Sequence, residues 1–218
     1  MIKDIILGFK LLKYGYKLKT NVIMAVLFTF IGIYMEVVSE GTNLIGGFYF
    51  MIIGIFVYQM IMSVDVSEYI QTSPMKRKLQ ITIPVITSTV FYLCIFTFLI
   101  IERVILINNM PEKREMLLGS LFQIVIFMLI TFMFTSVCYK YFWTGYVVFL
   151  GLVFAVIIFM NIFLSTPLAD KLLSLPIGIF AIMGYAVIFI GAALETIIGK
   201  ALYKKPLSDF AFRGVFKD

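Results

Sequence analysis

The chain has 218 residues, of which 62% are hydrophobic and only 14% are charged, and its net charge is +6. Soluble domains carry about 25% charged residues, so this composition is typical of a protein embedded in a membrane. The sequence has no histidine, and its two cysteines, Cys94 and Cys138, fall inside apolar runs. A zinc site of Cys and His ligands, Ser–His–Asp chemistry and a disulfide framework are therefore excluded. We expect no catalytic, cofactor-binding or metal-binding residues on this chain.

Long apolar runs separate short islands of charge. A helix needs roughly 20 mainly apolar residues to cross the hydrocarbon core of a bilayer. Six runs have about that length: 20–38, 44–64, 79–101, 117–138, 144–164 and 176–198. The pattern predicts an all-α integral membrane protein with six transmembrane helices. Residues 1–218 form a single transmembrane domain, and 199–218 form a tail.

The positively charged residues predict the orientation. With both termini on one side, that side carries fourteen of the 18 Lys and Arg residues, and the other carries Arg103, Lys113, Arg114 and Lys171. Because cytoplasmic loops are enriched in Lys and Arg, both termini are predicted to be cytoplasmic. Attraction to anionic lipid head groups explains the net charge, so no nucleic-acid partner is expected. The predicted external connections are 36–43, 102–116 and 165–175, the last with a short surface helix.

Residues 1–19 are predicted to form an amphipathic helix in the membrane interface. Its lysines Lys3, Lys10 and Lys17 recur every seven residues, and Lys13 lies among them. The predicted apolar face consists of Ile2, Ile5, Ile6, Phe9, Leu12 and Tyr16, whereas Leu7 and Leu11 fall off it. Such a helix lies in the interface plane with its lysines toward phosphate groups. The alternative is a basic flank that only fixes the topology.

The connection between the second and third spans is predicted to contain a short helix over 65–73. Asp65 can cap it, Glu68 stands in the capping-box position, and Ser73-Pro74 should end it. We interpret it as a docking helix for a cytoplasmic partner, and an ordinary solvated loop is the alternative. The candidate contact residues are Asp65, Val66, Glu68, Tyr69, Gln71, Thr72 and Ser73.

Few polar residues fall within or at the ends of the predicted spans. The candidates are Glu36, Gln59, Gln123 and Glu195. Interfacial placement or hydrogen bonding between helices explains such residues, and a relay role is the alternative. The 23 Phe and 13 Met residues are ordinary in a membrane protein, but a wall of them would suit a hydrophobic or amphipathic cargo.

The chain has no phosphate-binding loop of the G-x-x-x-x-G-K-[ST] type. Gly199-Lys200-Ala201 lacks both the second glycine and the hydroxyl residue. If ATP drives this protein, another polypeptide must bind it.

The layout resembles the membrane subunit of ABC-2-type transporters, in particular the small six-span permeases of Gram-positive bacteria. The resemblance covers the lysine-rich segment before the first span, the six spans, the acidic start of the connection at Asp65 and the short segment before the last span. The run Ser73-Pro74-Met75-Lys76-Arg77 is similar to the SP-x-[KR]-[KR] sequence often seen there.

The resemblance implies a function and its partners. Two permease copies, identical or paralogous, would pair with two cytoplasmic ATP-binding subunits, which would hold ATP and Mg. The 65–73 helix would be the coupling helix. A hydrophobic or amphipathic peptide, bacteriocin or drug-like molecule would leave the cell between the permeases, past spans one, two and five. The chain would lie in the bacterial cytoplasmic membrane and would not itself be an enzyme.

Three other functions compete with this one. A stand-alone transporter or channel often shows internal repeats, but no convincing three-plus-three repeat is visible here. A membrane scaffold or immunity protein has no sequence signature. An intramembrane enzyme would need a constellation such as paired aspartates, and none is visible.

Overall fold

The structure is a computed structural model that describes residues 2–15, 17–64, 72–138, 140–206 and 208. Within these ranges the secondary structure is entirely helical, and six helices are long and apolar enough to cross a membrane. The fold class predicted from the sequence is confirmed. The six helices are α2 (Leu18–Ser39), α3 (Leu44–Val64), α5 (Ile83–Asn109), α6 (Arg114–Cys138), α7 (Phe142–Phe163) and α9 (Ile177–Leu202). Two shorter helices are α1 (Ile2–Leu12) and α8 (Pro167–Leu173).

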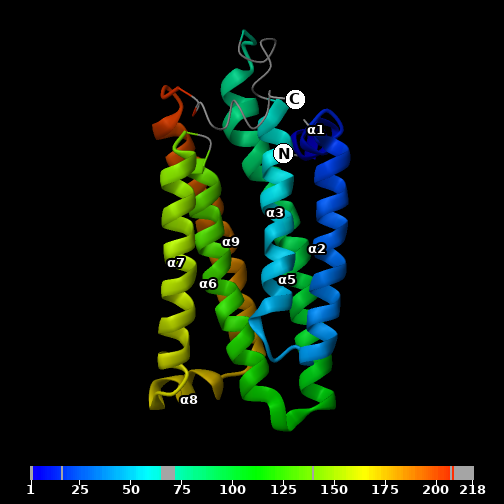
Figure 1. The fold of residues 1–218 in the computed structure, drawn as a ribbon, viewed down its shortest axis with the longest axis vertical. Helices are drawn as coiled ribbons and strands as arrows, with labels where there is room; N and C mark the ends of the chain where they lie inside the picture. Colours follow the sequence, from blue (N-terminus) through cyan, green and yellow to red (C-terminus); the bar gives the residue numbers. More distant parts are fainter. Residues whose placement is uncertain (1, 16, 65–71, 139, 207, 209–218) are drawn as a thin grey trace.

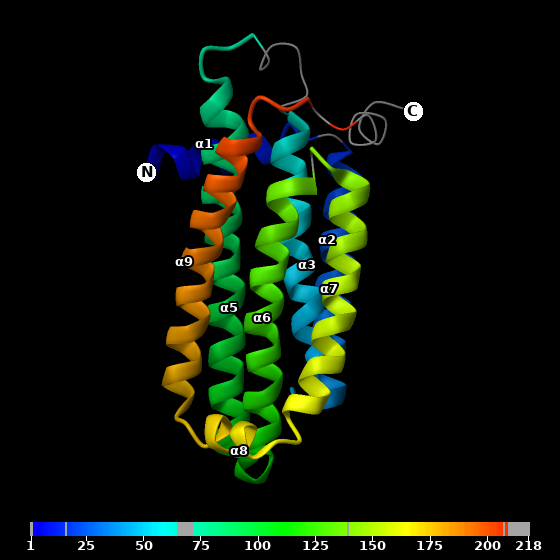
Figure 2. The same ribbon diagram turned by 90° about the vertical axis from the view of Figure 1, so that its left-hand side faces the viewer.

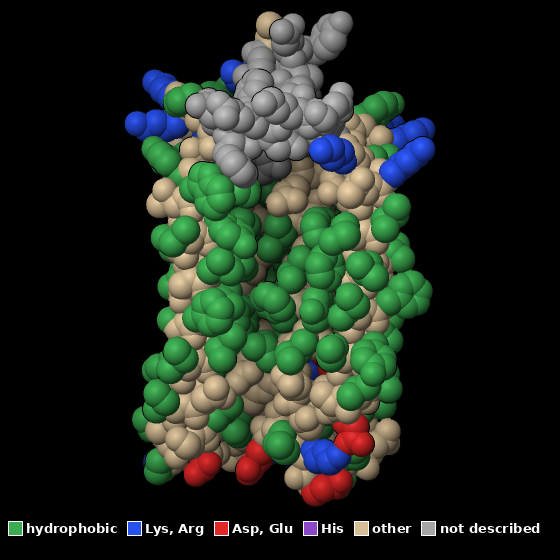
Figure 3. Space-filling model, in the orientation of Figure 1, with side chains coloured by type: hydrophobic (Ala, Val, Ile, Leu, Met, Phe, Trp, Pro, Cys, Tyr) green, Lys and Arg blue, Asp and Glu red, His purple; other side chains and the backbone are tan. Residues whose placement is uncertain are grey.

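The six long helices stand side by side in two layers (Figures 1 and 2). One layer contains α2, α3, α6 and α7, each packed on the next, and the other contains α5 and α9, which cover α3 and α6 from behind. One end of the bundle carries α1 and the start of α5, and most of the lysines gather there (Figure 3). We call it the lysine-rich end and the opposite one, which carries α8, the α8 end.

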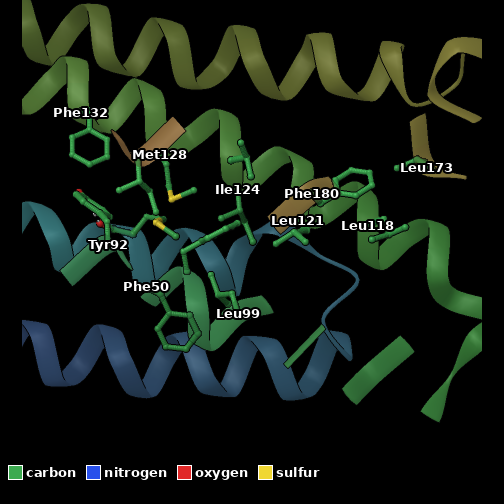
Figure 4. Packing of buried hydrophobic residues seen from close by; sticks show 14 residues of the cluster. Phe50, Tyr92, Leu99, Leu118, Leu121, Ile124, Met128, Phe132, Leu173 and Phe180 are labelled. Atoms are coloured by element: carbon green, nitrogen blue, oxygen red, sulfur yellow. Dashed lines mark hydrogen bonds between the residues drawn. The ribbon is translucent and has the colours of Figure 1, made fainter. Parts of the chain in front are cut away.

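Helix α6 is the central helix of the bundle. It is the most buried of the six and packs on α3, α5, α7 and α9. Because its sequence is apolar on all sides, no face prefers water and each can accept a neighbouring helix. Figure 4 shows the main core, in which Leu121, Ile124, Met128 and Phe132 of α6 meet side chains from α3, α5 and α9.

Glycines allow large side chains to approach neighbouring helices closely. A β-carbon at Gly54 would lie 2.3 Å from the ring of Tyr92, and one at Gly191 would lie 2.4 Å from Phe132. Small residues at helix contacts are typical of membrane proteins, because dispersion contacts hold the helices together where water is absent.

The third span is longer than the sequence pattern predicts. We expected it to end at residue 101 and be followed by a connection over 102–116, but α5 continues to Asn109 and α6 begins at Arg114. Between them lie Met110 and the single turn Pro111–Lys113. The expectation was wrong because Glu102 and Arg103 looked like the end of an apolar run, whereas their charges are paired inside the bundle.

The start of the third span is a widened helical turn. Residues Lys78–Thr82 form a π-helix, and the N–H of Ile83 donates to the carbonyl oxygen of Lys78. Pro84 follows within the first turn of α5. Proline has no N–H and its ring crowds the carbonyl four residues earlier, so a wider turn relieves a clash that an ordinary α-helix would contain.

The short helix expected in the last external connection is present as α8. It begins at Pro167 after an extended Thr166 and lies across the end of the bundle (Figure 2). The guanidinium of Arg114 at the start of α6 donates to the carbonyl oxygens of Leu173 and Leu175 at 3.0 and 2.8 Å. A cation placed on the carbonyls that follow a helix favours that helix end, so Arg114 fixes α8 to α6.

Candidate functional site

A buried ion-pair cluster lies near the α8 end. Arg103 of α5 binds Glu36 of α2 with both branches of its guanidinium, Nη1 to Oε2 at 2.9 Å and Nη2 to Oε1 at 3.2 Å. The Nη1 group also donates to Glu102 at 2.8 Å. Arg103 is fully buried and Glu36 is 4% exposed, whereas Glu102 is 22% exposed. A planar guanidinium with two parallel bonds to one carboxylate is a strong and directional contact.

The turn between α2 and α3 covers this cluster. Gly41 has a φ of +72°, a left-handed conformation that favours glycine. A β-carbon there would lie 2.5 Å from Nη1 of Arg103. The hydroxyl of Ser120 on α6 donates to the carbonyl oxygen of Gly41 at 2.8 Å. The cluster therefore ties α2, α5 and α6 together through one turn of backbone.

The sequence pattern predicts only part of this cluster. It indicates Glu36 as a candidate intramembrane residue but places Arg103 in an external connection, and it gives no sign of the contacts of Gly41 and Ser120. The signal that was available is the apolar stretch Val104–Ile107 directly after Arg103. It extends the helix by a turn and makes Arg103 an intrahelical charge that needs a partner.

The two glutamines predicted at membrane depth lie on the four-helix layer. Gln59 is half-buried on α3 and Gln123 is half-buried on α6. Neither belongs to the ion-pair cluster of Arg103, Glu36 and Glu102. Each places one polar amide on a mostly apolar helix, and the two helices, α3 and α6, are neighbours.

Glu195 lies deep in the bundle near the lysine-rich end. It is 1% exposed, and within the described residues its two carboxyl oxygens have no hydrogen-bond partner. The neighbouring hydroxyl of Thr135 is directed instead to the backbone carbonyl oxygens of Thr131 and Phe132, at 3.1 and 3.0 Å. A small cavity lined by Ser136, Lys140 and Gly199, among others, lies one turn of α9 closer to the lysine-rich end. An ionisable group at this depth is a candidate functional residue.

The four-helix layer presents a hollow apolar face. Figure 3 shows this face, which is hollowed between two outer ridges and covered with hydrophobic side chains over most of its height. Helices α2 and α7 form the ridges, and α3 and α6 lie between them (Figures 1 and 2). The two ridge helices are the least buried of the six, so each exposes most of its apolar surface.

At the lysine-rich end, α1 lies across the bundle and packs on α3 and α5 (Figure 2). Gly8 sits directly against Thr87 of α5, and Gly15 sits against Met60 of α3. Asp4 forms a salt bridge of 2.5 Å with Lys78. The helix expected before the first span is therefore present and packs on the protein, while its predicted place in the membrane interface stays a prediction.

The faces of α1 differ from the prediction. Leu7 and Leu11, which fall off the predicted apolar face, pack on the core with Leu12, while Ile2, Ile6 and Phe9 are exposed. The helix has two apolar faces, one packed on α3 and α5 and one exposed, and the prediction allowed for only one. The leucines of α1 therefore contact the protein core, whereas Ile2, Ile6 and Phe9 are exposed on the outer side of the helix.

The helix is also shorter than expected. It ends at Leu12, so Lys13 and Lys17 lie in the turn before α2, whereas Lys3 and Lys10 stay on the helix. Lys17 has a left-handed backbone with a φ of 49°. A left-handed residue cannot continue a right-handed helix, so Lys17 separates this turn from the start of α2.

Most of the predicted docking helix lies outside the described residues. Asp65, Val66, Glu68, Tyr69 and Gln71 belong to that part, so their predicted roles stay predictions. The described part begins with Thr72 and Ser73, which are not helical. Ser73 accepts two hydrogen bonds: its hydroxyl oxygen accepts the N–H of Met75 at 3.1 Å, and its backbone carbonyl oxygen accepts the N–H of Lys76.

The fold and these features define a class of protein. The chain is a multi-pass membrane protein, and its described residues form an all-helical bundle with six candidate spans and paired buried charges. Comparisons with protein-family models, with curated proteins and with solved structures found no match.

Proposed function

We propose that the chain is the membrane-spanning permease of an ATP-driven exporter of the ABC-2 type, paired with a second copy and powered by a cytoplasmic ATP-binding subunit. The hollow apolar face is the observation that carries this proposal. Two such faces placed opposite each other, with α2 of each copy against α7 of its partner, would enclose an apolar passage. The passage would be lined by α3 and α6, which are spans two and four, and bounded by α2 and α7, which are spans one and five, whereas the resemblance implies a lining of spans one, two and five.

The charge distribution supports a partner at the lysine-rich end. In the proposed orientation this end faces the cytoplasm, as the positive-inside rule requires. Helix α1 and the end of α3, from which the segment 65–73 continues, then lie where a cytoplasmic subunit can reach them. Because α1 is packed on α5 through Gly8, a push on α1 would reach a spanning helix directly. A rigid helix transmits motion that a loop would lose to conformational freedom.

The chemistry of the face favours an apolar or amphipathic cargo. On α3 and α6 the side chains that keep some exposure are mostly apolar, such as Phe48 and Met133. Ions or sugars need polar groups along their path, whereas most of the side chains that α3 and α6 contribute are apolar. A hydrophobic peptide or drug-like molecule fits this surface better.

The coupling to ATP is tested by reversing charge in the docking segment. We expect the affinity-tagged chain, purified from its native membrane, to carry a subunit with a G-x-x-x-x-G-K-[ST] loop and to hydrolyse ATP. The double substitution Asp65→Lys, Glu68→Lys should lower the retained subunit and the ATPase rate roughly tenfold or more, since like charges across an interface oppose docking. Both are measured on the purified complex.

The matched control is Glu112→Lys, which makes the same change at an exposed residue at the α8 end. It should leave association and hydrolysis unchanged. The proposal is wrong if the docking variant behaves like this control, or if the purified chain moves solute in vesicles without the subunit.

The pairing of two hollow faces is tested by cross-linking in lipid nanodiscs. Phe30 on α2 and Phe154 on α7 are both exposed, and each lies twelve residues into its helix from the lysine-rich end. With Cys94 and Cys138 replaced by alanine, the double variant Phe30→Cys, Phe154→Cys should give a covalent dimer with a short bis-maleimide. The measurement is the apparent mass on a denaturing gel.

The control pair, Phe98→Cys with Phe189→Cys, places equally exposed cysteines on α5 and α9 of the opposite layer. It should stay monomeric. Dimers from the control pair alone would contradict the proposed arrangement.

A further inference from the structure

A cavity with a positive lining lies between α1 and the start of the third span. Its volume is about 390 Å³. On the α1 side Lys3, Asp4, Ile6, Leu7 and Lys10 line it, and on the other side Met75 and Lys78 do. Lys3 and Lys10 are seven residues apart on α1, which places them two turns apart on the same face of the helix.

The charges of this cavity do not cancel. Three lysines and one carboxylate leave a net charge of +2. Asp4 is hydrogen-bonded to Lys78, with a separation of 2.5 Å, and this contact lowers the pKa of the Asp4 carboxyl. Lys3 and Lys10 are exposed, and within the described residues no salt bridge involves either of them. The cavity therefore offers two cationic groups beside an internal pair.

The cavity lies at the depth of lipid head groups. Helix α1 crosses the bundle close to its lysine-rich end (Figure 2), and its face formed by Ile2, Ile6 and Phe9 is exposed. A helix with this pattern buries its exposed apolar face at the boundary between head groups and acyl chains. Ile6 belongs to that face and also lines the cavity, so the apolar surface of α1 is continuous with the cationic cavity.

We propose that this cavity binds the phosphate head group of an anionic phospholipid, with Lys3 and Lys10 on the phosphate and the acyl chains along Ile2, Ile6 and Phe9. Asp4 holds Lys78 when the cavity is empty and limits the positive charge available to the ligand. Basic pockets on the cytoplasmic side of membrane helices suit such head groups. The proposal depends on the membrane setting and not on transport.

The test measures lipid retention by native mass spectrometry of the full chain in a neutral detergent. The probes are a short-chain phosphatidylglycerol, the matching phosphatidylcholine and inorganic phosphate. We expect the chain to bind the phosphatidylglycerol most tightly. Each lysine near an anionic lipid strengthens binding about fivefold. The double variant Lys3→Gln, Lys10→Gln should therefore weaken phosphatidylglycerol binding roughly thirtyfold, and Asp4→Asn, which removes one negative charge, should strengthen it about fivefold.

The matched control removes the same charge elsewhere. The double variant Lys13→Gln, Lys204→Gln changes two exposed lysines outside the cavity lining and should shift phosphatidylglycerol binding less than about threefold. Three results would each overturn the proposal. They are an equal loss in this control, equal binding of phosphatidylcholine, and binding of inorganic phosphate as tight as that of the lipid.

Discussion

Replacing Arg103 by methionine should lower the free energy of unfolding by about 3–5 kcal/mol, because it leaves the buried carboxylate of Glu36 without its partner. The methionine keeps much of the volume of the arginine stem, so packing changes little. The loss comes from a charge that has no water around it and no counter-ion beside it. Glu102 shares the same guanidinium and loses its partner as well. The measurement is thermal or denaturant unfolding of the purified chain in one detergent.

Two further variants separate this effect from a general loss of charge. Lys113→Met breaks the exposed pair between Lys113 and Glu40 and should change stability by no more than about 1 kcal/mol. The double variant Glu36→Met, Arg103→Met removes both buried charges and should recover most of the stability lost in Arg103→Met. If Arg103→Met is as mild as Lys113→Met, the guanidinium does not hold this end of the bundle together.

The sequence predicts the number and type of the spans because hydropathy acts on whole segments. A run of about 20 apolar residues has no stable place outside a bilayer, so α2, α3, α6, α7 and α9 fall close to their predicted ranges. The end of α5 was misplaced because hydropathy counts Glu102 and Arg103 as polar. A hydropathy pattern does not include the contact by which Glu36, 67 residues away in the chain, neutralises Arg103. Long-range pairing is not visible in a local pattern.

The candidate sites were predictable to different degrees. A periodic pattern locates α1, but not which apolar stripe faces protein, because Leu7 and Ile6 are equally hydrophobic and only the positions of α3 and α5 distinguish them. The cavity between Lys3 and Lys78 also depends on how α1 packs on α3 and α5, so a local sequence pattern does not predict it. The sequence indicates Glu195 as a candidate because a carboxyl in an apolar helix is rare. That its carboxyl oxygens have no hydrogen-bond partner among the described residues can be seen only once the surrounding helices are in place.

The substitution Gly184→Val should destabilise the bundle by about 1–3 kcal/mol, or more if the neighbouring ring cannot move. A β-carbon at Gly184 of α9 would lie 1.9 Å from the ring of Phe96 on α5. Phe96 is fully buried and packs edge-on against Tyr185 with 5.3 Å between ring centroids. The ring therefore has little room, and α9 would have to separate from α5. Unfolding in detergent measures the effect.

Gly178→Val is the control on the same helix, because nothing lies within 4 Å of a β-carbon there. It makes the same chemical change without the clash and should change stability by less than about 0.5 kcal/mol. Adding Phe96→Ala to Gly184→Val should restore part of the loss, since the added volume then has space. Equal effects of valine at 178 and 184 would show that the cost belongs to the residue type, and that α5 and α9 do not approach as closely as Gly184 and Phe96 indicate.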